Sequence, residues 1–119
     1  MPSSTPESGD GELVAEVNAQ NRGGWTPLAY AACAGSRECV QLLLEHGADP
    51  NVRTKRGRTP AIIAATYGQS ECIVELHQHG ADLELRDNKD RTALFHAAAL
   101  GQDSVVQALV DLGASVHCV

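Results

Sequence analysis

A unit of 33 residues occurs three times in this chain of 119 residues. Its markers are three threonines and two sets of glycines: Thr26, Thr59 and Thr92; Gly35, Gly68 and Gly101; Gly47, Gly80 and Gly113. A strict period of this length predicts stacked supersecondary units rather than one closed globule. In such a stack, we expect function to reside on the surface that the repeats share and not in a buried catalytic pocket.

Each unit carries the signals of two helices. The threonine stands where a helix N-cap is expected, and Pro27 and Pro60 follow it at the first helical position. An Ala-rich first helix is then expected to end at the first glycine. Because apolar residues recur with helical spacing, second helices are predicted over 37–45, 70–78 and 103–111. The polar linkers 48–58 and 81–91 return the chain as extended hairpins.

The domain boundaries follow from composition and from the period. Residues 1–12 are rich in Ser, Pro, Gly and acid, and we predict a disordered leader there. Residues 13–119 are predicted to form the repeat domain, in which 13–20 is the stub of an earlier unit. The three full repeats are placed at about 21–53, 54–86 and 87–119.

These units resemble the ankyrin-repeat family, whose consensus runs D-x-x-G-x-T-P-L-H-x-A-A-x-x-G and ends in V-x-x-L-L-x-x-G-A-D-x-N. The similarity covers about residues 13–119. It implies an all-α solenoid of helix-turn-helix units with β-hairpin fingers, acting as a protein-binding scaffold or adaptor. Two segments, NRGGWTPLAYA and DRTALFHAA, are also similar to ankyrin blocks of adaptors that carry sterile-alpha-motif domains.

The chain departs from the family consensus at several positions. The consensus histidine of TPLH is missing, and the position holds Ala29, Ile62 and Phe95. Asp90 replaces the turn glycine seen at Gly24 and Gly57, where left-handed backbone geometry costs a residue with a side chain more. His77 stands at the position of Leu44, so we expect a half-buried imidazole that weakens the second helix pair.

Charge is unevenly distributed along the chain. The net charge of −6 and the pI of about 5.2 argue against a general nucleic-acid binder. Eight of the nine Lys and Arg residues lie in linkers: Arg22, Arg53, Lys55, Arg56, Arg58, Arg86, Lys89 and Arg91. The acids concentrate in the second helices. We therefore predict a basic row of fingers and an acidic back.

We predict that the concave face of the stack and these basic fingers bind another intracellular protein. The expected ligand is an acidic or phosphorylated segment, because Arg supplies a fork of donors. The alternative is that solvated hairpin tips simply tolerate Lys and Arg. Aromatic and arginine side chains most often dominate interface energy. The candidate partner-binding residues are Arg22, Trp25, Tyr30, Lys55, Arg56, Arg58, Tyr67, Lys89, Arg91 and Leu100. For Trp25 the competing role is to shield the base of the first finger.

The sequence shows no catalytic constellation, and we predict no enzyme activity, no cofactor and no metal. His77 and His79 are two residues apart and point to different helix faces. Cys39 and Cys72 share the repeat position of Val105, so we expect small buried hydrophobes rather than a disulfide or metal ligands. Reduced thiols indicate a cytoplasmic or nuclear protein, and no apolar run is long enough to cross a membrane.

One modification is implied by the family resemblance. Similar proteins are substrates of an asparaginyl hydroxylase that prefers Leu eight residues before, and an acid two residues before, the target Asn. Leu43, Asp49 and Asn51 match this pattern. Pro50 departs from it, because that position is usually aliphatic.

Two alternatives to a partner-binding module remain at this stage. The segment VELHQHGADLELRD is similar to small ankyrin inhibitors of cyclin-dependent kinases, although their shortened first helix is not evident here. The other alternative is a structural segment of a longer ankyrin array. Its open ends would self-associate, because Val106, Leu109 and Leu112 would lose their cover.

Overall fold

The computed structural model describes residues 17–114, in which helices form three consecutive pairs. The predicted leader 1–12, the first part of the stub and the end of the third repeat lie outside this range. The helices are α2 Pro27–Ala34, α3 Arg37–Glu45, α4 Pro60–Thr66, α5 Ser70–Gln78, α6 Ala93–Leu100 and α7 Asp103–Asp111. The ranges predicted for the second helices of the three repeats are confirmed.

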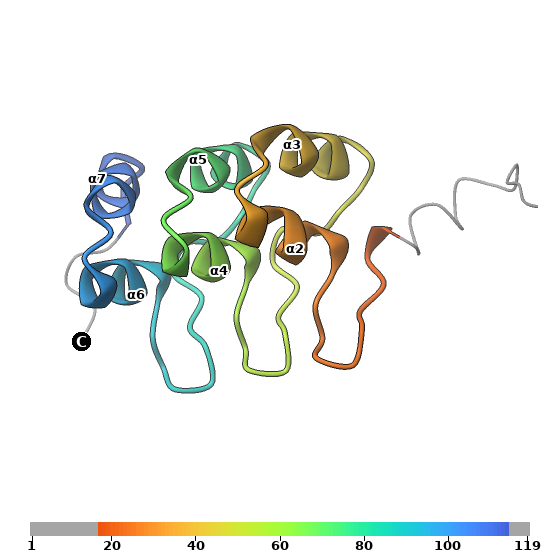
Figure 1. Ribbon diagram of the computed structural model, residues 1–119, viewed down its shortest axis with the longest axis horizontal. Coiled ribbons are helices and arrows are strands. Elements are labelled where there is room, and N and C mark those ends of the chain that lie inside the picture. The colour runs from red at the N-terminus through yellow and green to blue at the C-terminus, as the bar shows by residue number, and fades with distance from the viewer. Residues whose placement is uncertain (1–16, 115–119) are drawn as a thin grey trace, which may run out of the picture.

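The helices lie in two rows (Figure 1). One row holds the first helices α2, α4 and α6, and the other holds the second helices α3, α5 and α7. Each helix packs on its partner within the repeat and on its neighbours in the same row. The molecule is therefore an all-α repeat solenoid, as the sequence period predicts.

Each first helix begins directly after the threonine that recurs every 33 residues. The hydroxyl oxygens of Thr26, Thr59 and Thr92 accept hydrogen bonds from the backbone N–H three residues later, at 3.1, 3.2 and 3.2 Å. Each bond satisfies a donor that the first helical turn leaves without a backbone partner. Gly35 and Gly101 end α2 and α6 in the left-handed conformation.

The N-cap residues of α5 and α7 bind the preceding repeat and do not cap their own helix with their side chains. Gln69 and Gln102 precede α5 and α7 but make no capping bond with their side chains. Instead, Gln69 Nε2 donates to the Cys33 carbonyl at 3.1 Å, and Gln102 Nε2 donates to the Thr66 carbonyl at 3.0 Å. Both bonds reach the preceding repeat, so these residues join neighbouring units at equivalent places.

The core runs continuously through the stack. Large side chains that are fully buried include Leu28, Ile62, Ile73, Leu76 and Leu109. Alanines of the first helices, such as Ala64 and Ala97, are also fully buried. Their small side chains allow the helix rows to approach closely, and this explains why a chain with so few aromatic residues still packs.

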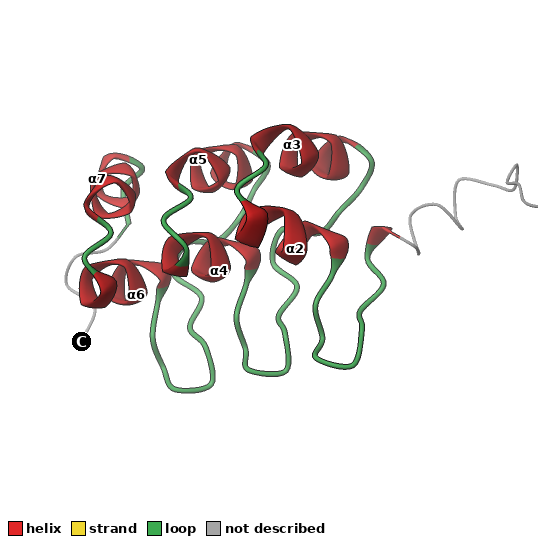
Figure 2. Cartoon of the chain, viewed as in Figure 1, coloured by secondary structure: helices red, strands yellow, loops and turns green. Residues whose placement is uncertain are grey.

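The linkers form three hairpin fingers that Figure 2 shows as loops. Over residues 17–114 no β-strand forms, and two backbone bonds close each tip. The N–H of Asn21, Thr54 or Asp87 donates to the carbonyl four residues later, and the carbonyl of the same residue accepts from the N–H three residues later. Neighbouring fingers are joined by backbone bonds from Lys55 N–H to the Gly23 carbonyl and from Asn88 N–H to the Arg56 carbonyl, both 2.9 Å. The expected hairpins are present without a β-ladder.

Three expectations about burial are wrong. Cys39 is exposed, whereas Cys72 and Val105 at the same repeat position are buried, because only they have a second helix of an earlier repeat to pack on. His77 is exposed rather than half-buried. Its equivalent Val110 is exposed as well, so among the three repeats this position is buried only at Leu44. Leu109 is fully buried and does not lose its cover at the end of the stack.

Asp90 adopts the left-handed geometry expected from its place in the third finger, with φ of 66°. The equivalent glycines Gly24 and Gly57 have φ of 82° and 79°. The Asp90 carboxylate lies 3.3 Å from Arg86 Nη1. This ion pair is exposed and offsets little of the backbone cost.

Gly57→Ala tests the close approach of the second and third fingers. A Cβ at Gly57 would meet the side-chain amide of Asn88 and lie 2.8 Å from its backbone nitrogen. At Gly101, which has a similar φ of 70°, a Cβ would meet nothing within 4 Å. We expect Gly101→Ala to cost about 1–2 kcal/mol from backbone geometry, and Gly57→Ala about 1–3 kcal/mol more from overpacking.

Urea unfolding followed by circular dichroism measures both variants against the wild type. Equal losses for Gly57→Ala and Gly101→Ala would contradict the close contact between the two fingers.

Candidate partner-binding site

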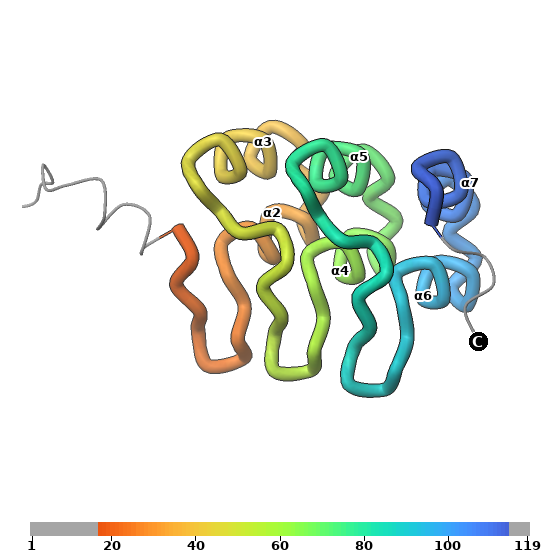
Figure 3. Tube along the Cα trace, turned by 180° about the vertical axis from the view of Figure 1, so that it is seen from behind, coloured from red at the N-terminus to blue at the C-terminus, as the bar shows by residue number. Residues whose placement is uncertain are grey.

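The three fingers, 19–25, 52–58 and 85–91, project from the row of first helices on the side away from the second helices (Figure 3). We call the surface formed by these fingers and the adjoining sides of α2, α4 and α6 the finger face. All eight linker bases lie in the fingers. The exposed acids of the second helices are Glu38, Glu45, Glu71, Asp103 and Asp111. Charge is therefore separated between the finger face and the back.

A cavity of about 390 Å³ lies between the second and third fingers. We call it the basic pocket, and its lining residues are Arg56, Arg58, Asp87, Asn88, Lys89 and Arg91. Four of these six are cations that the sequence analysis places among the candidate binding residues. The structure thus brings Arg56 and Arg58 of one finger together with Lys89 and Arg91 of the next.

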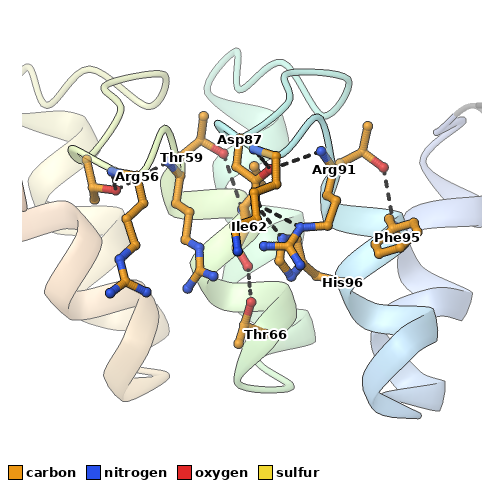
Figure 4. Close-up of polar contacts among 12 residues, drawn as sticks. Arg56, Thr59, Ile62, Thr66, Asp87, Arg91, Phe95 and His96 are labelled. Atoms are coloured by element: carbon orange, nitrogen blue, oxygen red, sulfur yellow. Dashed lines mark hydrogen bonds and ion pairs between the residues drawn. The ribbon is translucent and has the colours of Figure 1, made fainter.

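Asp87 organises the base of the third finger (Figure 4). Its Oδ1 accepts from the backbone N–H groups of Lys89 and Arg91 at 2.9 and 3.0 Å. Its Oδ2 lies 2.8 Å from His96 Nε2, in α6, and 3.4 Å from Arg91 Nε. This single carboxylate therefore shapes the finger tip, holds Arg91 and ties the finger to the helix.

The surroundings of Asp87 stabilise its charged form. Burial by itself raises the pKa of this carboxyl, but the hydrogen bond from His96, the backbone bonds from Arg91 and Lys89, and the charge of Arg91 together lower its pKa to about 2. Asp87 is consequently ionised at neutral pH. Both of its oxygens are occupied within the chain, and Arg91 is the one cation of the pocket with which it forms an ion pair.

Two arginines of the basic pocket carry buried donors without an acceptor. The Nε atoms of Arg58 and Arg91 are shielded from solvent and make no hydrogen bond. The 3.4 Å contact of Arg91 Nε with Asp87 is an ion pair that lacks hydrogen-bond geometry. Among residues 17–114, no acidic side chain forms an ion pair with Arg56, Arg58 or Lys89. The pocket therefore keeps a large excess of positive charge.

A second, shallow depression, of about 330 Å³, lies at the first finger and is widely open to solvent. We call it the aromatic pocket, and it is lined by Ala19, Gln20, Asn21, Trp25, Pro27 and Tyr30. The rings of Trp25 and Tyr30 are 4.9 Å apart between centroids. Asn21 Nδ2 donates to the Tyr30 hydroxyl at 2.6 Å, which holds that ring in place. The two aromatic side chains thus form a rigid wall beside an open space.

The structure reveals paired positions that sequence reasoning missed. Asn21 bonds to Tyr30 in the first repeat, and Asp87 bonds to His96 in the third, with the partners nine positions apart in each case. In the middle repeat the same positions hold Thr54 and Ile63, so the side-chain bond is lost. The signal in the sequence was a polar pair at this spacing in the outer repeats.

Other predicted residues lie apart from both pockets. Tyr67 and Leu100 are 55% and 54% exposed, at the ends of α4 and α6 that are remote from the fingers. Arg22 and Lys55 are exposed within the fingers and line neither cavity. The structure does not gather these four residues with the rest of the predicted site.

Asn51 is built into a junction between repeats. Its Oδ1 accepts from the Asp82 backbone N–H at 2.8 Å, and its Nδ2 donates to the Gly80 carbonyl at 3.4 Å. Asp49 Oδ1 accepts from the Asn51 N–H at 2.9 Å. The side chain is half-buried, so an enzyme that modifies it requires the loop to open locally.

Within residues 17–114, no group of three or more His, Cys, Asp or Glu side chains is placed to hold a metal ion. The three cysteines in that range, Cys33, Cys39 and Cys72, are free. None of the helices in this part of the chain combines the length and the apolar character that a membrane span requires.

Comparison with known families agrees with the repeat architecture. A family model described as ankyrin repeats (3 copies) matches residues 46–119, and another, described as ankyrin repeats (many copies), matches residues 11–64. The chain therefore belongs to the ankyrin-repeat family. Repeats of this family are generally protein–protein interaction modules, and most are not enzymes.

Asp87→Asn tests how strongly the third finger depends on this carboxylate. Because the pKa of Asp87 in the folded chain lies below the ordinary value of 3.8, its stabilisation is present above that value and is lost as pH falls towards 2. We expect Asp87→Asn to lower the free energy of unfolding at pH 7 by roughly 2 kcal/mol.

Urea unfolding of the two proteins between pH 7 and pH 2 measures this difference. The gap between the wild type and Asp87→Asn is expected to close below about pH 3.8. A gap that stays constant over the whole range would contradict the role given to the Asp87 charge.

Proposed function

We propose that this chain is a non-catalytic binding module that holds an acidic or phosphorylated segment of another intracellular protein across the finger face. A cytoplasmic or nuclear location belongs to the same proposal. The observation that carries it is the basic pocket, where cations of two neighbouring fingers surround a cavity of about 390 Å³. Its one carboxylate is committed to bonds within the chain.

The proposal is supported by the way in which the pocket arginines are held. Freely solvated tips would account for exposed residues such as Lys55 and Arg56. Arg58 and Arg91, in contrast, are half-buried and carry donors without acceptors. Half-burial restricts these two side chains, and each guanidinium carries donors besides Nε that a bound oxyanion can accept from.

Trp25 extends the proposed surface towards the first repeat. It occupies the repeat position of Arg58 and Arg91, so a segment running across the fingers would meet these three side chains in turn. An aromatic anchor beside charged contacts is the usual composition of an energetically dominant interface centre.

The double substitution Arg56→Glu with Lys89→Glu tests the proposed surface. Both side chains are exposed, so the fold is expected to survive. Because exposed charges act mainly by steering, the association rate with the partner isolated from cytosol should fall by about tenfold or more, with a flatter dependence on salt.

The matched control is Glu38→Lys with Glu71→Lys, which changes exposed charges on the second helices α3 and α5. Biolayer interferometry at several salt concentrations compares the two double variants. Loss of binding in the control, with normal binding in the finger variant, would show that the proposed surface is the wrong one.

A second candidate function, a structural segment of a longer array, is favoured by the end of the stack. Phe95 is 54% exposed, although Ala29 and Ile62 at the same repeat position are 2% and 1% exposed. Val110 is 42% exposed, whereas its equivalent Leu44 is 8% exposed. In both earlier units the next repeat covers the Phe95 position, so a further repeat or a second copy would cover Phe95. The Val110 position is covered only at Leu44, because its equivalent in the middle repeat, His77, is exposed.

Phe95→Glu tests this stacking. If the open end associates, the wild type should form concentration-dependent dimers, and a charge at Phe95 should abolish them, because it would be buried without a partner. Tyr67→Glu is the matched control, since Tyr67 is 55% exposed at the far end of α4. Sedimentation equilibrium measures the mass, and dimers that persist in Phe95→Glu would contradict the stacking.

The third reading, a small kinase inhibitor, gains no support. The first helices α2, α4 and α6 have 8, 7 and 8 residues. No described repeat therefore has the strongly shortened first helix that this similarity requires.

We also propose Asn51 as an acceptor for asparaginyl hydroxylation, on the pattern Leu43, Asp49 and Asn51. Incubation with such a hydroxylase should add one oxygen to the intact chain, as measured by mass spectrometry. Asn51→Ala should remove the addition, whereas Asn18→Ala, at the equivalent position without the upstream Leu, should keep it. Addition of oxygen to the Asn51→Ala chain would contradict the assignment.

A further inference from the structure

We propose that the finger face recognises a segment with two anchors, a phosphorylated serine or threonine in the basic pocket and a bulky apolar side chain in the aromatic pocket. This inference rests on the proposed function, because it names the ligand of the same surface. It adds a choice of phosphate over carboxylate, a second anchor, and a spacing between the two.

The charge of the basic pocket favours a phosphoryl group over a carboxylate. Four cations and one carboxylate line the cavity, which leaves an excess of three positive charges. A phosphorylated side chain carries close to two negative charges and three acceptor oxygens at neutral pH, whereas a carboxylate carries one charge and two oxygens. Arginines also bind phosphate through a planar fork of donors, and three of the four cations are arginines.

The backbone around the basic pocket is held in place before any ligand binds. Asn88 lies between the fingers, where its backbone N–H donates to the Arg56 carbonyl at 2.9 Å and its Nδ2 donates to the Lys55 carbonyl at 2.7 Å. Asp87 holds Arg91 from the other side. Finger backbone held in this way requires little ordering on binding, which favours affinity for a small charged group.

The aromatic pocket supplies an anchor of a different kind. Trp25 and Tyr30 form its wall, Ala19 and Pro27 add apolar surface, and no charged residue lines it. Its volume of about 330 Å³ is sufficient for one large side chain. Apolar burial against rigid aromatic rings adds affinity without the salt dependence of the charged contacts.

The repeat geometry sets the distance between the anchors. The aromatic pocket lies at the first finger, and the basic pocket lies between the second and third, about one and a half repeats away. Neighbouring repeats are separated by a helix-packing distance of roughly 8–10 Å, and an extended chain advances about 3.3 Å per residue. The two anchor residues should therefore be roughly four or five positions apart in an extended segment.

The test is a peptide library with a fixed central phosphoserine and randomised flanks, bound to the immobilised wild-type chain. We expect it to be retained at least about tenfold more tightly than matched libraries with serine or aspartate at the centre. Bulky apolar residues should be enriched roughly four or five positions from the phosphoserine, on one flank.

Three variants separate the two anchors. Trp25→Ala should abolish the apolar enrichment and keep the preference for phosphoserine. Arg58→Gln should reduce that preference and keep the apolar enrichment. Tyr67→Ala, which removes an equally exposed aromatic residue outside both pockets, should change neither. Circular dichroism and urea unfolding verify that each variant is folded.

Equal retention of the phosphoserine and aspartate libraries would overturn the choice of phosphate. Apolar enrichment that is absent, has no fixed spacing, or survives Trp25→Ala would overturn the second anchor. These failures differ from failure of the proposed function, which appears only if Arg56→Glu with Lys89→Glu leaves binding of the isolated partner unchanged.

Discussion

The structure depends on one constraint, which is that no repeat can bury its apolar face alone. Each junction between repeats therefore uses the same set of contacts. Helices of one row pack on those of the next, and a Gln side chain reaches back to a carbonyl of the preceding unit, from Gln69 and again from Gln102. Because the junctions are equivalent, the fingers stand in a row at a regular spacing, and neighbouring fingers are hydrogen-bonded to one another.

The chemistry of the finger face follows from this regular spacing. Residues at one repeat position line up along the stack, so variation between repeats becomes variation along a surface. At the finger base the position changes from Trp25 to Arg58 and Arg91, which gives an aromatic pocket at one end and a basic pocket further along. Asp87 and His96 then fix the last finger to its helix, and this bond keeps Arg91 at the edge of the cavity.

The sequence predicted what depends on local signals, and it failed where a residue's place in the stack decides its environment. The threonine caps, the second helices and the left-handed Asp90 follow from short-range chemistry and were predicted correctly. Repeat periodicity alone assigns the same burial to equivalent positions. It therefore predicted that Cys39 is buried and that His77 is half-buried, although both side chains are exposed. The sequence identified the basic residues of the fingers as candidates. It could not tell which of them line the basic pocket and which are solvated elsewhere, because that depends on side-chain packing between fingers.

Amide hydrogen exchange of the chain, free and bound to its isolated partner, tests the central claim most directly. If the finger face is the binding surface, exchange should slow in the second and third fingers, 52–58 and 85–91, and around Trp25. Exchange in the second helices α3, α5 and α7 should stay the same. Protection confined to those second helices, with unchanged exchange in the fingers, would contradict the account.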